Sequence, residues 1–298
     1  MKHLDYKLVS ALDAVISTGS FETAAQTLHI TQSAVSQRIR ELEKRLAQPL
    51  LIRSQPPMPT ETGRKLLGLY RRVQLLEQDV LPELCYNADA LPYPTLSLAA
   101  NADSVASWLI PALADTLRTH SVSLDLVIAD ESRTLDLLRK GEVIGAISLD
   151  SHTLPGCRCD RLGRMDYRCV ATPAFIARYF PEGITHEALR QAPAAVYDYH
   201  DTLHQTFFQQ HFAFDDNAMP SHTARSSEAF IKLACEGLAY CLIPDLMIRQ
   251  ALETGILKDV TPGLTVNRHL YWHRWALETD LLKRVSRDLV RHACEVLA

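Results

Sequence analysis

The sequence predicts a multi-domain protein of the α/β class, with a helical N-terminal part, a connecting helix and an α/β body. Three observations support this prediction. Residues 20–46 form two short amphipathic helices joined by a tight turn, and residues 66–80 carry an apolar stripe at heptad spacing. From residue 95 onward, short apolar runs alternate with helical stretches. A length of 298 residues accommodates two or three domains.

The composition is that of an ordinary globular protein. It is 47% hydrophobic and 22% charged. No apolar run is long enough to span a membrane, and the N-terminus lacks the pattern of a signal peptide. Seven cysteines without a regular framework fit reduced thiols. We therefore expect a cytoplasmic protein.

The charge is divided unevenly along the chain. Residues 1–72 hold 11 Lys or Arg against 6 Asp or Glu, whereas the other residues hold 20 against 29. A basic N-terminal part on an acidic body is typical of a DNA-binding module joined to a domain with another task. Chance clustering is the alternative explanation.

Helix-capping residues and apolar stripes predict the elements of the N-terminal part. A first helix is expected over residues 5–17, ended by Gly19. Ser20 is placed to cap the second helix, and Thr31 the third. The third helix carries a stripe at spacings of 4, 3 and 4, formed by Val35, Ile39, Leu42 and Leu46. The pattern is that of a helix-turn-helix.

The other face of the third helix is polar. A polar helix face usually meets only solvent, but in a helix-turn-helix it lies on DNA. Hydroxyls and amides can read base edges, while Arg and Lys hold phosphates or guanine. We predict contacts with double-stranded DNA from Thr31, Gln32, Ser33, Ser36, Gln37, Arg38, Arg40, Lys44 and Arg53.

A wing and a long helix are expected next. Residues 49–53 predict a strand and the proline-rich residues 54–59 a loop, with Arg53 at its base. Thr60 begins a helix that Pro82 limits, and residues 87–94 resemble a hinge. The helix carries an a/d seam at Leu66, Leu69, Val73, Leu76 and Val80. The seam predicts dimerisation, and packing within one subunit is the alternative.

The sequence from residue 95 onward predicts a parallel α/β domain, followed by a second subdomain from about residue 164. Strands are expected at residues 95–100, 123–129, 143–149, 166–171, 194–197, 238–243 and 268–275. Helices are expected at residues 108–117, 135–139, 173–180 and 280–297. The strand at 268–275 is expected to return the chain to the first subdomain.

Polar residues follow several of these strands. Ligands of open α/β sheets bind beyond the carboxyl ends of the strands, near helix N-termini. The candidate residues are Asn101, Asp103, Ser104, Asp130, Glu131, Ser132, Ser148, Asp198, Ser226 and Ser227. Hydroxyls and helix N-termini suit a carboxylate, and acids suit ammonium or guanidinium groups. The set fits a cationic amino acid, although each residue alone could be only a helix cap.

Enzymatic and metal-binding functions are not supported. Cys157 and Cys159 lack the spacing of a zinc knuckle, even with Cys169 and His152 nearby in sequence. Nucleotide-binding and hydrolase motifs are absent from the sequence. We expect no cofactor, no metal and no catalytic residue. A DNA-binding protein without an effector remains an alternative.

The N-terminal motif resembles the LysR-type transcriptional regulators. The similarity lies in Gly19-Ser20-Phe21, Ala24-Ala25, Thr31-Gln32-Ser33-Ala34-Val35-Ser36, Ile39 and Leu42-Glu43. The resemblance covers the whole chain. It implies a winged helix-turn-helix over residues 1–60, a linker and dimerisation helix with a hinge over 61–90, and an effector-binding domain over 91–298. That domain would be two-lobed and similar to periplasmic solute-binding proteins, with lobe I at 91–163 and 268–298 and lobe II at 164–267. The family wing is usually more basic than the proline-rich segment here.

The body resembles one branch of that family, which senses lysine and arginine and controls basic amino-acid export. The similarity lies in Asn101-Ala102-Asp103-Ser104, Arg139-Lys140-Gly141-Glu142-Val143, Ser226-Ser227-Glu228-Ala229-Phe230 and Leu270-Tyr271-Trp272-His273-Arg274. The branch has also been described as an inhibitor of chromosome initiation. The resemblance implies L-lysine or L-arginine as effector, with a different metabolite as the alternative. It further implies a nucleoid-associated homodimer or homotetramer, with RNA polymerase as an additional partner.

Overall fold

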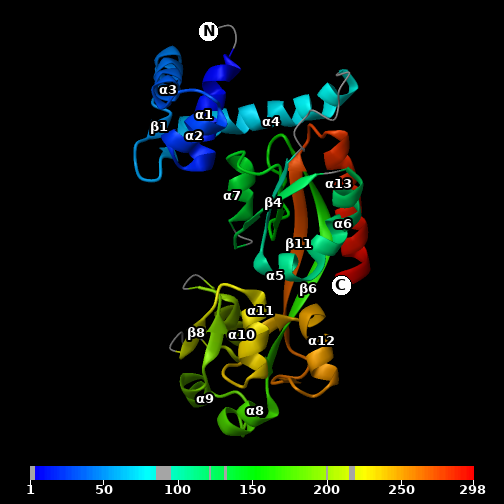
Figure 1. Cartoon of the computed structure of the whole chain (residues 1–298). Coiled ribbons are helices and arrows are strands. Elements are labelled where there is room, and N and C mark those ends of the chain that lie inside the picture. The colour runs from blue at the N-terminus through cyan, green and yellow to red at the C-terminus, as the bar shows by residue number, and fades with distance from the viewer. Residues whose placement is uncertain (1–3, 85–94, 121, 131–132, 199–200, 215–218) are drawn as a thin grey trace.

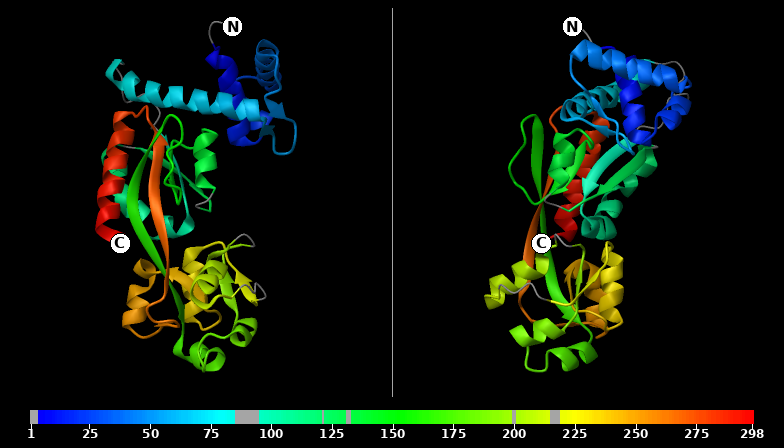
Figure 2. Two further views of the ribbon diagram at one scale, coloured as in Figure 1. Left: turned by 180° about the vertical axis from the view of Figure 1, so that it is seen from behind. Right: turned by 90° about the vertical axis from the view of Figure 1, so that its left-hand side faces the viewer.

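The computed structural model describes residues 4–84, 95–120, 122–130, 133–198, 201–214 and 219–298. A helical N-terminal domain is followed by one long helix and by two lobes that share strands of a single sheet (Figure 1). The long helix lies across one end of the first lobe, and the second lobe lies at the opposite end in all views (Figures 1 and 2). None of the helices in the described ranges is both long and apolar enough to cross a membrane.

The N-terminal domain confirms the expected helix-turn-helix. Its elements are α1 (Tyr6–Thr18), α2 (Phe21–Thr27), α3 (Gln32–Leu46), β1 (Leu51–Ile52) and β2 (Met58–Pro59). Gly19 ends α1 with a φ of 68°, and the hydroxyls of Ser20 and Thr31 cap α2 and α3. One expectation was wrong. The loop predicted over 54–59 includes β2, which pairs with β1, so the wing is a hairpin.

The helix α4 (Glu61–Leu84) begins where the sequence predicts, with the Thr60 hydroxyl accepting from Gly63 N at 3.0 Å. Pro82 does not stop it. A proline this close to a helix end removes one backbone hydrogen bond and leaves the preceding turns intact. The predicted hinge at 87–94 lies outside the described residues.

The first lobe holds the parallel strands and the C-terminal helix. Its elements are β3 (Thr95–Ala100), α5 (Ala102–Ser104), the π-helix η2 (Val105–Leu109), α6 (Ile110–His120), β4 (Ser123–Ile128), α7 (Thr134–Arg139), β5 (Gly145–Ser148) and α13 (Asp280–Val296). The indole of Trp272 packs so close to Gly145 that a Cβ there would meet it at 2.0 Å. A glycine is therefore required at that point of β5.

The second lobe contains more helices than the sequence predicted. Its elements are α8 (Pro173–Tyr179), α9 (His186–Gln191), β7 (Ala194–Val196), α10 (Leu203–Phe212), β8 (Ser221–Thr223), α11 (Ser227–Cys235), β9 (Cys241–Pro244), α12 (Asp245–Glu253) and β10 (Lys258–Asp259). The helices α9 to α12 and the strands β8 and β10 were not predicted.

Two long antiparallel strands join the lobes, β6 (Cys157–Ala171) and β11 (Thr265–Trp275). Seven strands form the sheet in the order β10-β6-β11-β5-β3-β4, with β9 also paired to β6. The sheet is therefore mixed, which corrects the prediction of a parallel one. The strands expected at 166–171 and 268–275 are the second-lobe part of β6 and most of β11. Both expected lobe boundaries fall inside these strands, because each strand serves both lobes.

A buried histidine gives the second lobe a pH-dependent stability. His204 is 2% exposed among Phe208 and Tyr240, and neither ring nitrogen has a hydrogen-bond partner in the described part of the chain. Burial lowers the pKa of His204 from 6.5 to about 4, against a smaller opposing effect of Asp201. The neutral ring is therefore favoured in the folded protein.

We expect this histidine to destabilise the fold as the pH falls from 6.5 towards 4. Below pH 6.5 the His204 side chain binds a proton in the unfolded chain, whereas in the folded chain it stays neutral until the pH approaches 4. Between pH 7.5 and pH 5 the free energy of unfolding should fall by roughly 2 kcal/mol more in the wild type than in His204→Phe. Urea unfolding of both proteins at both pH values measures this difference. Equal pH dependence in the two proteins would contradict the assignment.

Candidate functional site

The exposed face of α3 is polar along its length. Thr31, Gln32, Ser33, Gln37, Arg40 and Lys44 are exposed, and Ser36 is half-buried. At about 100° per residue, the members of this set that belong to α3 all fall on one flank of the helix. Val35, Ile39 and Leu42 are buried against α1 and α2 on the other side. Arg38 lies on the far flank of the buried stripe, about 100° from this set.

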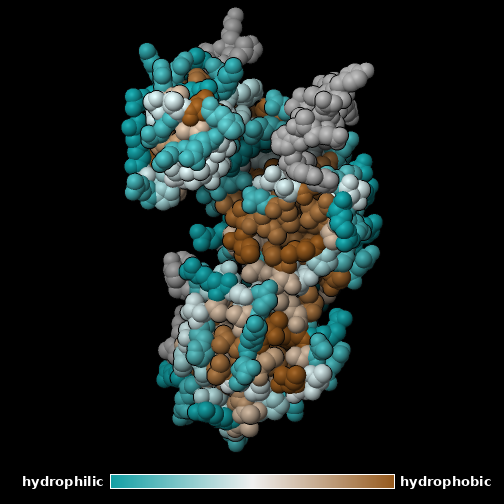
Figure 3. All heavy atoms as spheres, viewed as in Figure 1, coloured by the Kyte–Doolittle hydropathy of each residue, from teal (hydrophilic) through white to brown (hydrophobic). Residues whose placement is uncertain are grey.

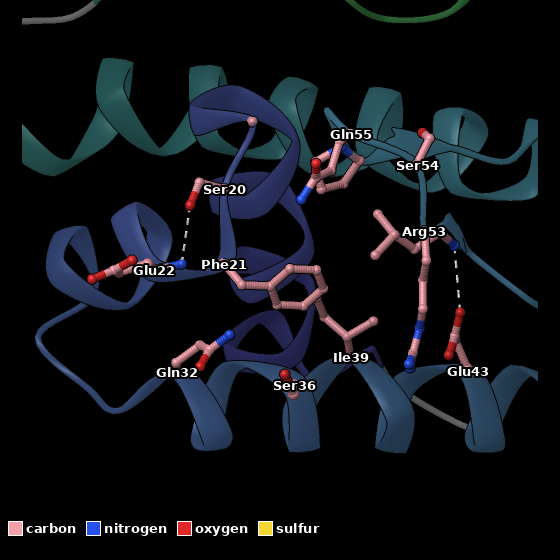
Figure 4. Close-up of a pocket in the computed structure, with 13 residues that line it drawn as sticks. Ser20, Phe21, Glu22, Gln32, Ser36, Ile39, Glu43, Arg53, Ser54 and Gln55 are labelled. Carbon is pink, nitrogen blue, oxygen red and sulfur yellow. Dashed lines mark hydrogen bonds between the residues drawn. The ribbon is translucent and has the colours of Figure 1, made fainter.

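A hollow of about 470 Å³ separates α3 from the wing (Figure 4). Gln32 and Ser36 lie along its α3 side, while Phe21 and Ile39 point towards one another at its base. The side chain of Arg53 extends from the wing towards α3 in the same view. The hollow thus brings the wing cation and the polar helix face together.

The wing is held to α3 by a carboxylate. Glu43 accepts from Leu50 N at 2.9 Å and from Leu51 N at 3.4 Å. Thr60 Oγ1 donates to the carbonyl of Pro49 at 2.8 Å, which joins the residue after the hairpin to a residue before it. These contacts fix the wing relative to α3, as the predicted reading of DNA shape would require.

A second candidate site lies between the lobes. It is a cavity of about 90 Å³ lined from the start of α5, the residues that follow β4, the strands β6 and β11, and lobe II. Five of the ten predicted effector residues line it: Asn101, Asp103, Asp130, Asp198 and Ser227. Residues more than 120 positions apart in the sequence therefore lie together, as expected beyond the carboxyl ends of strands in an open α/β sheet.

Asp103 is the central side chain of this cavity. Its two carboxylate oxygens accept from Ser227 Oγ and from Tyr167 OH, each at 2.6 Å. Burial raises the pKa of Asp103, the two hydroxyl donors oppose that rise, and the charges of Asp201 and Glu228 add to it. A carboxylate bonded only to neutral hydroxyls in such a place favours the approach of a cation.

The cavity also contains one cation that the sequence analysis missed. Arg268 lines it from β11, and its Nε is buried without a hydrogen-bond partner among the described residues. Asp201 lines it too, but its carboxylate already accepts from the backbone of Tyr197 and Leu203 at 2.9 Å. The lining acids, Asp103, Asp130, Asp198 and Asp201, outnumber the one cation.

Three other predicted effector residues, Ser104, Ser148 and Ser226, do not line the cavity. Ser104 and Ser148 are buried in lobe I, where the Ser148 hydroxyl accepts from Asp150 N at 3.2 Å. Ser226 caps α11 by accepting from Ala229 N at 3.3 Å. These residues shape helix starts and strand ends. Glu131 and Ser132 lie outside the described residues.

The cysteine and histidine positions considered for a metal do not assemble. The Cys159 thiol lies 3.5 Å from His273 Nε2, while His152 pairs with Asp150 at 2.7 Å. In the part of the chain that the structure describes, there is no group of three or more His, Cys, Asp or Glu able to hold a metal ion.

The geometry defines a winged helix-turn-helix joined to a two-lobed domain with a charged cavity between its lobes. Residues 6–64 match the bacterial regulatory helix-turn-helix proteins of the lysR family, and residues 90–293 match the LysR substrate binding domain. The chain belongs to the LysR family of DNA-binding transcriptional regulators, and so it is a regulator rather than an enzyme.

Curated relatives agree over the full length. The chain is 53% identical to the HTH-type transcriptional regulator ArgP of Photobacterium profundum, covering 100% of this chain and 99% of that one. It is 52% identical to ArgP of Vibrio vulnificus, covering 98% of each chain. The expected branch of the family is therefore confirmed.

Solved structures show the same architecture. Crystalline ArgP from Mycobacterium tuberculosis is 33% identical and aligns with a TM-score of 0.85 over 99% of both chains. Full-length LysG from Corynebacterium glutamicum with bound effector Arg is 29% identical, with a TM-score of 0.76 over 99% of both chains.

The polar face of α3 leads to a prediction about sequence reading. Replacing Gln37 or Ser33 by Ala should weaken binding to a specific site by about 1–3 kcal/mol and leave binding to random DNA nearly unchanged. The reason is that base-edge contacts are made only with the correct sequence. Fluorescence anisotropy on specific and random duplexes measures both affinities. Equal losses on the two duplexes would remove the base-reading role.

Arg53 leads to a different expectation, because a cation on a phosphate contributes to all DNA sequences. Arg53→Ala should weaken specific and random binding alike and reduce the salt slope of log K by about one unit. Arg45→Ala is a control, since that side chain is already paired with Glu41 and Asp5. A slope that does not change in Arg53→Ala would exclude the phosphate contact.

Proposed function

We propose that this regulator senses a basic amino acid, L-lysine or L-arginine, in the cavity between its lobes and controls genes for basic amino-acid transport, export or metabolism. The observation that carries the proposal is the excess of carboxylates over cations around Asp103. A basic amino acid has one carboxylate and two cationic groups, which matches one guanidinium among several acids.

Each end of such a ligand has a candidate partner. The α-carboxylate would meet Arg268, whose Nε lacks a partner in the described chain, and the nearby start of α11 at Ser227. The α-ammonium and the side-chain cation would meet Asp103, Asp130 and Asp198. A neutral or acidic metabolite would bring no positive charge to Asp103, whose carboxylate accepts hydrogen bonds from the neutral hydroxyls of Ser227 and Tyr167.

The size of the cavity adds a condition. At about 90 Å³ it is smaller than the ~300–1,000 Å³ common for ligand sites. Entry of an amino acid therefore requires the lobes to separate, with loss of the Ser227–Asp103 hydrogen bond that crosses the gap. The bound effector arginine of LysG, which shares the whole architecture, supports the same class of ligand.

We further propose that the chain acts as a homodimer through α4 and lobe I, with a homotetramer as the larger alternative. Leu69 is 40% exposed, and Val73 and Leu76 are half-buried on the same flank of α4. Leu66 instead packs on the N-terminal core, and the side chain of Val80 lies outside the described ones. In Figure 3 apolar side chains also gather on lobe I, where Ile110 and Ile128 are about half exposed. RNA polymerase as a partner and association with the nucleoid stay predictions.

Asp103 provides the decisive test of the effector. Asp103→Asn removes the buried charge, and the affinity for lysine or arginine should fall by about 2 kcal/mol or more, which is about thirty-fold. Arg268→Gln should weaken binding to the ligand's carboxylate in the same assay. Calorimetry on the full-length chain measures both.

The matched control is Asp136→Asn, since the exposed Asp136 pairs with Arg139 on α7 and does not line the cavity. It should bind the ligand like the wild type. If the wild type binds neither amino acid at millimolar concentration but binds an acidic or aromatic metabolite, the choice of ligand is wrong, and the family assignment is unaffected.

The dimer has its own test. Val73→Lys places a charge on the open flank of α4, where a symmetric partner would bury two copies of it. The dimer should dissociate and affinity for a two-half-site DNA should collapse. Val73→Leu, which keeps the side chain apolar, should preserve both. Sedimentation that finds an intact Val73→Lys dimer would show that this flank does not form the interface.

A further inference from the structure

The linker helix makes an unusually close contact with lobe I of its own chain. Gly68, in the middle of α4, crosses the turn that follows α7 at Gly141. A Cβ added to Gly141 would lie 2.1 Å from Gly68 Cα, and one added to Gly68 would lie 3.0 Å from the Lys140 carbonyl oxygen. Backbone meets backbone here, which only glycines allow.

The two glycines are needed for different reasons. Gly141 has a φ of 69°, and its N–H donates to the Leu138 carbonyl at 3.0 Å to end α7. Gly68 is helical, and a glycine in a helix interior is about 1 kcal/mol less favourable than alanine. The local structure of α4 therefore does not favour Gly68, whereas the close contact with lobe I does.

A cation–π contact lies one turn further along α4. The Arg72 guanidinium stacks over the Trp275 ring at 4.3 Å, and its Nε donates to the Gly68 carbonyl at 2.9 Å. Arg72 thus connects the glycine contact to the last residue of β11. Gly68 and Arg72 share one flank of α4, separate from the Leu67 and Tyr70 flank that packs on the N-terminal domain.

The partner of Arg72 belongs to the strand that reaches the effector cavity. Arg268 lines the cavity and Trp275 ends the same strand, β11, seven residues later. Seven residues of strand span about 23 Å. β11 pairs with β6 along this stretch and with β5 as well from Tyr271 to Arg274, so a movement of the lobes that shifts Arg268 also acts on the surface on which α4 rests.

We propose that the Gly68–Gly141 crossing and the Arg72–Trp275 stack form a docking contact that sets the orientation of the DNA-binding domain on lobe I. Effector binding changes DNA affinity by shifting the population of the docked state. The second part rests on the proposed effector, whereas the first part does not. The docked flank differs from the Leu69–Val73 flank, so docking and dimerisation can occur together.

Two substitutions test the contact. Gly68→Ala improves the intrinsic helix propensity of α4 but brings a Cβ to 3.0 Å from the Lys140 carbonyl oxygen, so the helix and the α7 turn must move slightly apart. Arg72→Gln removes the stacked cation. Lys65→Gln is the matched control, because Lys65 is an exposed cation on the same helix that pairs with Glu61. Sedimentation and thermal unfolding confirm that each variant is folded and assembled.

Hydrogen exchange and DNA binding are measured on the full-length chain. In Gly68→Ala and Arg72→Gln, amides in peptides covering 66–74 and 138–144 should exchange faster than in the wild type and in Lys65→Gln. Without effector, affinity for a duplex selected from random sequence by the wild type should change about five-fold or more. With lysine or arginine, the ratio of DNA affinities with and without ligand should approach one. The affinity for the amino acid should shift towards that of the undocked state, because the coupling between ligand binding and docking is reciprocal.

If amide hydrogen exchange and DNA affinity in both variants equal those of the wild type, the docking contact is excluded. An altered affinity for DNA with an unchanged response to the amino acid would overturn its role in transmission. If the wild-type protein shows no response to either amino acid, the proposed effector fails, and the exchange and ligand-free affinity measurements still decide whether α4 is docked.

Discussion

The antiparallel pairing of β6 with β11 is the constraint on which the rest of the effector domain depends. It extends from Cys157 opposite Trp275 to Arg168 opposite Thr265, and it runs through both lobes. The two strands carry Tyr167 and Arg268 to the cavity between the lobes. Because the lobes are joined through this pairing, which is interrupted only by a register shift between Leu270 and Tyr271, their relative movement must bend or twist these strands. Any ligand between the lobes therefore acts on the ends of the strands as well.

The N-terminal domain was predictable from its sequence because its determinants are local. A helix cap acts within three residues, and a buried stripe is visible within fifteen. Ser20, Thr31 and Gly19 all perform their expected roles. The second wing strand was missed because prolines indicate extended backbone, and only the register of Leu51 with Pro59 distinguishes a hairpin from a loop.

The body was harder to predict because its main determinant is nonlocal. A strand that crosses two lobes alternates between two environments, so its apolar pattern breaks where it leaves one core and enters the other. For this reason 166–171 was predicted as a separate short strand although it continues β6. The cavity residues at strand ends and helix starts, such as Asp103 and Ser227, were found by a topological rule. Tyr167 and Arg268 lie inside long strands, where that rule does not apply.

The linker helix α4 makes a different contact on each of three flanks. Leu67 and Tyr70 pack on the N-terminal core, Gly68 and Arg72 meet lobe I, and Leu69 and Val73 face outward. At about 100° per residue these three pairs fall on three flanks roughly 120° apart. A helix with a single apolar stripe could serve only one of them. The residue types differ accordingly: bulky apolar residues where a core must be filled, a glycine where two backbones cross, and an arginine where a flat aromatic ring ends the sheet. The sequence of α4 is therefore set by the spatial arrangement of the domains around it, more than by its own propensity to form a helix.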